Sequence, residues 1–244
     1  MDWTKAKTIL IVALLITNIF LLCLYFSMKT DNGPTEERLQ AETIALLEEK
    51  QIYIRGNLPD EHQKMPVLIV EYDRLDPEYI SQKIDEQKPS DEEYVSREEV
   101  LKKTEEFLKD CGLWNKNVVL NKVEQNEDTF IVSYRNEYEG IPIEDSYIIC
   151  TVRKGAVKEI DRFWLKPVGY GKSKKATLSA SAALIDLMRS KNERDAILVE
   201  DIKMVYWLDP SDYEGETAVS DTALPAWKIT YNEGQIKHVP AYSD

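Results

Sequence analysis

The stretch TILIVALLITNIFLLCLYF, residues 8–26, decides how the rest of this chain is organised. None of its residues is charged, and an α-helix of this length is about 28 Å long at 1.5 Å per residue. The hydrocarbon core of a bilayer is about 30 Å thick, so the stretch crosses it once Ser27 and Met28 are added. The sequence therefore predicts a transmembrane anchor over residues 8–28, preceded by a short N-terminal segment of residues 1–7.

The charges on either side of this stretch predict its orientation. Lys5 and Lys7 precede it, whereas an acidic run, residues 31–37, follows soon after Lys29. Positively charged flanks stay on the cytoplasmic side of a membrane. We therefore expect a single-pass protein of the cell membrane, with residues 1–7 in the cytoplasm and the C-terminal domain outside it.

A cleaved signal peptide is the main alternative for this stretch. Such a peptide has an apolar region of about 7–15 residues and small residues at its cleavage site. The stretch here is longer, and no alanine occurs between Ala13 and Ala41. The bulky Leu22 before Cys23 argues against lipid attachment at that cysteine. The sequence favours an uncleaved signal anchor.

One face of the predicted anchor carries its most polar side chain. Asn18 stands at helical spacing from leucines and a tyrosine, and the face consists of Leu14, Thr17, Asn18, Leu22 and Tyr25. Polar side chains inside a membrane usually point into an interface, where an amide bonds to a second helix. We therefore expect this face to contact a partner helix; a tolerated polar residue facing lipid is the alternative.

The composition excludes several classes of function. The chain has 44 acidic and 31 basic residues, a formal net charge of −13, and the excess lies beyond the anchor. Such an acidic surface argues against nucleic acid and anionic polymers as partners. His62 and His238 are the only histidines and lack metal-ligand spacing. No metal site and no cofactor is expected.

Signals for catalysis and for a disulfide framework are equally weak. The sequence contains no phosphate-binding glycine loop, no Gly-x-Ser-x-Gly motif and no Cys-x-x-Cys motif. Beyond the anchor, Cys111 and Cys150 are expected to be buried thiols, although one disulfide between them remains open. The aromatic residues Trp164, Trp207 and Trp227 alternate within predicted strands and are expected in the core rather than in a ligand groove. An enzyme is not expected.

Residues 29–93 are predicted to form a membrane-proximal α/β segment. Thr35 is a potential N-cap for a helix that extends to about Lys50. Two strands are predicted at residues 52–54 and 67–72, the second as an apolar run buried on both faces. A helical turn is expected at residues 78–84.

The next segment, residues 94–170, is predicted to be a helix followed by an antiparallel sheet. Ser96 and Glu99 form a capping-box pattern before an apolar stripe that ends at Gly112. Alternating apolar and polar residues then predict four strands. These are residues 118–123, 129–135, 143–153 and 156–165, with a connector at 166–171.

The same pattern recurs in residues 171–244. Thr177 is predicted to cap a helix, and strands are expected at residues 201–208, 225–231 and 236–239, with a loop at 209–224. Two helix-on-sheet units in succession indicate an α+β fold.

Several local motifs resemble known families. The stretches YRNEYEGIPIEDSYI (134–148) and RKGAV (153–157) resemble the strands of PepSY-like domains. IKMVYW (202–207) and LPAWKI (224–229) resemble the matching strands of a second unit. The opening MDWTKAKTI (1–9), which leads directly into the anchor, resembles the start of YycI family proteins. The chain is thus similar to the YycI family over essentially its whole length.

This resemblance implies a non-enzymatic regulator of a two-component regulatory system. YycI family proteins act beside the YycG/WalK sensor histidine kinase, which controls cell-wall metabolism. They act together with a second single-pass protein, YycH, and contact the kinase through their membrane helices. The resemblance carries over no catalytic residue. Two alternatives remain: an extracytoplasmic ligand or cell-wall sensor, and an inhibitor of an exported protease, a role that PepSY-like units sometimes serve.

Overall fold

A computed structural model describes Trp3, Lys7, Ile11 and residues 13–22, 36–59, 64–87, 95–190, 195–209 and 220–242. The chain consists of two units, Met1–Glu49 and Lys50–Asp244.

The first unit is helical wherever the structure describes it. Residues 13–22 are α-helical, and helix α2 covers Glu36–Glu49, as the sequence predicts. Among the described residues, no helix combines the length and the apolar character needed to cross a bilayer. Of the predicted anchor, Ile11 and residues 13–22 are described, and the remainder lies outside the described residues.

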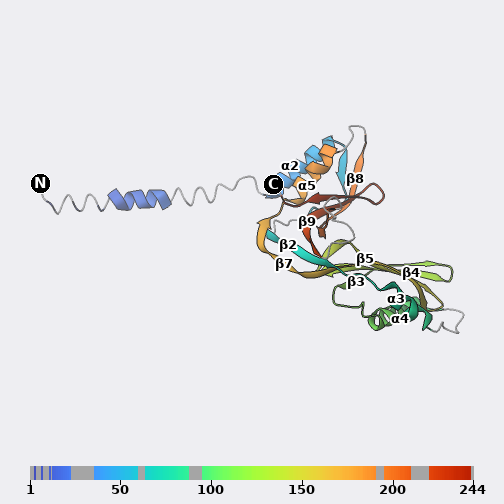
Figure 1. Ribbon diagram of the computed structural model, residues 1–244. Coiled ribbons are helices and arrows are strands. Elements are labelled where there is room, and N and C mark those ends of the chain that lie inside the picture. The colour runs from blue at the N-terminus through green and yellow to red at the C-terminus, as the bar shows by residue number, and fades with distance from the viewer. Residues whose placement is uncertain are drawn as a thin grey trace. The chain divides into compact units, whose positions relative to one another are not determined.

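The second unit is a mixed α+β fold, which confirms the predicted class (Figure 1). Its helices are α3 (Pro77–Asp85), α4 (Arg97–Asp110) and α5 (Ala180–Ser190). Its strands are β1 (Ile52–Ile54), β2 (Lys64–Tyr72), β3 (Val118–Asn126), β4 (Thr129–Tyr138), β5 (Ile141–Arg153), β6 (Ala156–Phe163), β7 (Leu165–Ala176), β8 (Ile197–Trp207), β9 (Ser220–Tyr231) and β10 (Gln235–Pro240).

All these strands belong to one ten-stranded sheet, ordered β3-β4-β5-β8-β9-β2-β7 with β6 beside β5, β10 beside β9 and β1 beside β8. The connection between β5 and β8 is a single parallel pair, Ile143 opposite Tyr206. Helices α3 and α4 lie against the β3–β6 part of the sheet, and α5 lies near β10 (Figure 1). Strand β2 lies in the predicted membrane-proximal segment, but it pairs with both β7 and β9, which come later in the chain. Strand pairing therefore crosses the segment boundaries that the sequence predicts at residues 93/94 and 170/171. These boundaries stay predictions.

Helix α4 begins and ends where the sequence predicts. The Ser96 side-chain oxygen accepts a hydrogen bond from the Glu99 N–H at 3.2 Å, which satisfies one free donor of the first turn. The Glu99 carboxylate pairs with Lys103 at 2.8 Å. At the other end Gly112 has a φ of +71°, a left-handed conformation that glycine adopts at little cost.

Two of the hydrophobic cores formed by the described residues lie in the second unit. One packs α3 and α4 on strands β3–β6 and includes Trp164, Cys111 and Cys150, the last two being buried and unpaired as expected. The other core packs β2, β7, β8 and β9 around Leu68 and Tyr206. Of the two other tryptophans that the sequence predicts to lie in the core, Trp227 is fully buried and Trp207 is half-buried.

The structure corrects four sequence-based expectations. The connector predicted at residues 166–171 is part of strand β7, which pairs with β2. Strand β2 is not buried on both faces, because Ile69 is 39% exposed between two fully buried neighbours. The loop predicted at 209–224 is strand from Ser220 onward. The cap of α5 is Ser179, whose side-chain oxygen accepts from the Ala182 N–H at 3.2 Å, and not Thr177.

Strand β7 approaches β2 so closely at Gly171 that a larger side chain at this position should clash. A Cβ atom at this position would lie 2.5 Å from Cγ2 of Val67, whereas one at Gly169 would meet nothing within 4 Å. Gly171→Val is therefore expected to destabilise the fold by about 1–3 kcal/mol through overpacking. Gly169→Val is the matched control and should be neutral or slightly stabilising, because valine favours strands. Thermal unfolding measures both; equal melting temperatures would contradict the register between β2 and β7.

Candidate functional site

The predicted partner-contact face lies on the helical residues 13–22. Leu14, Asn18 and Leu22 are four residues apart, so their side chains share one helix face, and all three are exposed. Thr17 differs, because its hydroxyl donates a hydrogen bond to the Ala13 carbonyl at 2.9 Å. Its capacity as a donor is thus used within its own helix.

Asn18 is the remaining polar group on this face. No contact of its side chain with another described residue is present, and Tyr25 lies outside the described residues. The role of the face in binding a partner helix stays a prediction. The local geometry gives Asn18 what that role requires: an exposed amide at the centre of an apolar helix surface.

In the second unit, polar side chains gather at an irregularity of strand β5. Arg135 on β4 pairs with Tyr147, but its neighbour Asn136 pairs with Ile143, so residues 144–146 form an insertion in β5. Asp145 in this insertion has a φ of +56°, a left-handed conformation that aspartate tolerates better than most residues. Because of this insertion, the side chains of residues 144–146 do not follow the regular alternation between the two faces of the strand.

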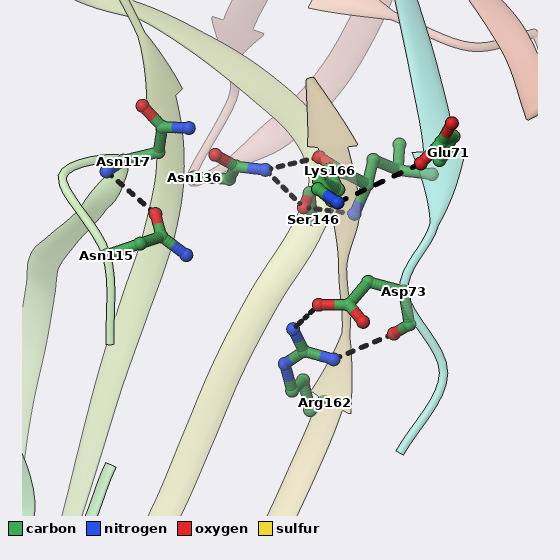
Figure 2. Close-up of polar contacts among 9 residues, drawn as sticks. Glu71, Asp73, Asn115, Asn117, Asn136, Ser146, Arg162 and Lys166 are labelled. Atoms are coloured by element: carbon green, nitrogen blue, oxygen red, sulfur yellow. Dashed lines mark hydrogen bonds and ion pairs between the residues drawn. The ribbon is translucent and has the colours of Figure 1, made fainter. Parts of the chain in front are cut away.

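A buried hydrogen-bond network fixes the insertion (Figure 2). The Asn136 side-chain amide donates to Ser146 Oγ at 3.0 Å and to the Leu165 carbonyl at 2.7 Å. Ser146 Oγ also accepts from the Leu165 N–H at 3.0 Å. The network thus connects β4, β5 and the start of β7 at one buried point.

Two ion pairs lie close to this network in Figure 2: one connects Asp73, the residue after β2, to β6, and the other connects β2 to β7. The Arg162 guanidinium donates to a carboxylate oxygen of Asp73 at 2.5 Å and to its carbonyl at 2.7 Å. The Arg162 side chain is almost completely buried and also lies over the ring of Trp164. Lys166 lies 4.0 Å from Glu71. These contacts hold the loop after β2 on the sheet.

A charged cluster connects the insertion to the C-terminal strands. Lys228 Nζ on β9 lies 2.6 Å from the Glu144 carboxylate, and His238 Nε2 on β10 lies 3.3 Å from the same oxygen. The His238 ring is stacked on Trp207, with centroids 5.2 Å apart. All three charged or titratable side chains are at least four-fifths buried. This cluster crosses the place where β5 meets β8.

Burial alone would raise the pKa of the Glu144 carboxyl group. Hydrogen bonds from His238 and Lys228, together with the positive charge of Lys228, lower the pKa by more than burial raises it. The pKa of Glu144 therefore lies below its ordinary value. A carboxylate whose pKa is lowered by folding stabilises the folded protein at pH values above its unfolded-state pKa. This stabilisation is lost as the pH falls through the folded-state pKa.

Glu144→Gln is expected to lower the stability of the second unit near neutral pH by about 1–3 kcal/mol, because Lys228 loses its buried counter-charge. The difference between the wild-type protein and this variant should shrink as the pH falls below the unfolded-state glutamate pKa of about 4.3 and through the lower folded-state pKa of Glu144. Denaturant unfolding at several pH values measures the difference. A constant difference from pH 7 to pH 3 would contradict this assignment, and Glu159→Gln at an exposed position is the control.

Sequence reasoning missed this cluster for a simple reason. Lys228 and His238 lie 84 and 94 residues from Glu144, and no local pattern brings them together. The described residues contain no group of three or more potential metal ligands. The arrangement joins β5 to β9 and β10.

Comparisons with known proteins place the chain in a family. A sequence model of the YycI protein family matches residues 34–242. No significant match was found among curated proteins. Among solved structures, the chain is similar to the C-terminal domain of Bacillus megaterium YpeB, with 12% identity and a TM-score of 0.36. That match covers 64% of this chain and 65% of the YpeB domain, and it carries no argument about function. Because the family match includes α2 and every strand of the sheet, this chain belongs to the YycI family.

Proposed function

We propose that this protein regulates a membrane sensor histidine kinase of the YycG/WalK type, and that it does so through contacts of its N-terminal helix. The YycI family is a regulatory, non-catalytic family. The observation that carries the proposal is this family match together with an exposed amide, Asn18, on an apolar helix face. The partners would be the kinase and a second single-pass regulator of the YycH type.

The physical argument rests on the solvent that surrounds the helix. Hydrocarbon offers an amide no hydrogen-bond partner, whereas a neighbouring helix does. Such a bond is worth about 0.5–2 kcal/mol. A kinase that exchanges between two states responds 5- to 150-fold to a coupling free energy of about 1–3 kcal/mol. One or two contacts of this kind are therefore enough to change kinase output.

The proposal includes a location in the cell membrane, with residues 1–7 in the cytoplasm and the second unit outside it. A reporter enzyme that works only outside the cytoplasm, fused after Asp244, is expected to be active, with the full-length protein in the membrane fraction. Replacing Lys5 and Lys7 with glutamate should weaken or invert this orientation, because these charges carry most of the cytoplasmic bias. Release of a product shortened by about 25 residues would contradict the anchor.

Two other functions make different demands on the chain. In a cell-wall or ligand sensor the second unit is essential, and removing it abolishes activity. A protease inhibitor works as the soluble fragment 31–244 without any anchor. The regulator proposed here keeps regulation when only residues 1–30 are present in the membrane. Expressing each part alone and measuring kinase-dependent transcription discriminates the three functions.

A further inference from the structure

Strand β7 has one unpaired edge. It is the last strand of the sheet path and pairs with β2 from Leu165 opposite Tyr72 to Ala176 opposite Lys64, with breaks in the register between Pro167 and Gly169 and between Tyr170 and Lys174. No other described strand pairs with it. An edge strand presents a row of free N–H and C=O groups, which is a template for a further strand. At twelve residues this edge is long.

The second half of β7 is strongly basic. Residues 172–176, with the sequence KSKKA, are exposed on both faces of the strand. Lys172 and Lys174 form no ion pair with any described residue. The Lys175 ammonium lies over the ring of Tyr242, 5.4 Å from its centroid. This concentration of positive charge stands out in a chain whose net charge is −13.

An open groove adjoins this basic edge. Its volume is about 870 Å³, and Lys175 belongs both to its lining and to the edge. The remaining described lining is mostly apolar, with Val67, Leu178, Ile185, Leu224 and Val239 among its members. Of the charged lining residues, Asp186 is paired with Lys237 at 3.2 Å. Lys175 and Arg189 therefore determine the net charge of the groove, and it is positive.

We propose that the free edge of β7 binds an extended acidic segment of a partner protein as an additional strand. Its backbone would pair with β7, its carboxylates would lie on Lys172 and Lys174, and an apolar side chain beyond them would enter the groove. Added strands gain affinity from backbone hydrogen bonds and specificity from side-chain pockets. The occupant is a protein segment because only a polypeptide pairs with the free backbone edge, and the acidic chain repels nucleic acid.

Lysine on an edge strand also has a protective role, because it prevents pairing with a second copy of the same edge. The two roles are compatible. Positive charges that repel another basic strand attract an acidic one, and this difference is what selects the partner. The proposal goes beyond regulation through the membrane helix and does not depend on it, because the edge lies entirely in the second unit.

The test uses the full chain in neutral detergent and a fluorescent eight-residue peptide that alternates glutamate and valine. We expect saturable binding by fluorescence anisotropy, and a loss of affinity of at least about tenfold, or 1.4 kcal/mol, in the double variant Lys172→Glu/Lys174→Glu. The control Lys116→Glu/Lys158→Glu makes the same charge change at exposed positions away from β7. Binding should also slow hydrogen exchange of backbone amides within residues 165–176.

Each other outcome overturns the proposal. Absence of saturable binding shows that the edge does not accept an acidic strand. An equal loss in both double variants shows that the peptide responds only to overall charge. Binding without slower amide exchange in β7 shows a side-chain contact in place of an added strand. Thermal unfolding of both variants establishes that they are folded, which the exposure of all four lysines favours.

Discussion

Replacing Thr104 with proline is expected to abolish the cooperative unfolding of residues 50–244. Thr104 lies in the middle of α4, is fully buried, and its hydroxyl bonds to the Val100 carbonyl at 2.7 Å. Proline removes a backbone hydrogen bond and its ring clashes with the preceding turn, which costs about 3 kcal/mol or more. A typical domain has only about 5–15 kcal/mol of stability.

The damage extends beyond the helix because α4 covers the core on strands β3–β6. Val100, Phe107 and Leu108 on its buried face pack on strands β3–β6. Thermal unfolding of fragment 31–244, followed by circular dichroism, measures the effect. Lys102→Ala, on the exposed face of the same helix, is the control and should melt like the wild-type fragment. A proline variant with an unchanged melting curve would contradict the role of α4 as a core helix.

The second large effect is expected for Asn18→Leu. Leucine keeps the length and raises the hydrophobicity of the helix, so membrane insertion should persist. Loss of the amide removes the proposed interhelical bond, so recovery of the partner proteins should fall. Kinase output should shift by a factor between about 2 and 30, which corresponds to the loss of one interhelical bond of about 0.5–2 kcal/mol. Co-purification from membranes and a kinase-dependent reporter gene measure the two effects.

A matched control comes from the same helix. Ile16→Leu also introduces leucine, but residue 16 is about 200° away from residue 18 around the helix axis. It should change neither partner recovery nor kinase output. If Asn18→Leu behaves like Ile16→Leu, the amide is not the contact. If an unrelated anchor grafted onto residues 31–244 preserves regulation, the contact is made outside the membrane.

The parts of the fold that could be predicted depend on local signals. Ser96, Glu99 and Gly112 identify both ends of α4, because capping and left-handed glycine act within one turn. The alternation from Phe130 to Tyr134 identifies β4 in the same way, since one face of that strand is buried. The residues within these two elements are therefore sufficient to predict them.

The parts that could not be predicted depend on distant partners. Residues 166–176 lack apolar alternation, and they become strand β7 only through pairing with β2, about a hundred residues earlier in the chain. The sheet order, in which β2 lies between β9 and β7, follows from no local pattern. Thr177 and Ser179 both have side chains able to cap a helix, and the start of α5 decides between them.

The same distinction applies to the candidate site. Asn18 is visible in the sequence because a lone amide within an apolar run is a local signal. The cluster of Glu144, Lys228 and His238 is invisible there, because three separate strands supply its members. A charge run such as residues 172–175 is visible but ambiguous, and only its place on an unpaired edge gives it a specific meaning.

Photocrosslinking from the helix in living membranes tests whether this helix face contacts the kinase or its second regulator. A photoreactive amino acid replaces residue 18 in one protein and residue 16, on the opposite face, in the other. The account predicts that position 18 captures the sensor kinase or the second single-pass regulator, identified by mass spectrometry, and that position 16 captures neither. Equal capture from both positions, or capture of lipid alone from position 18, would contradict regulation through this helix face.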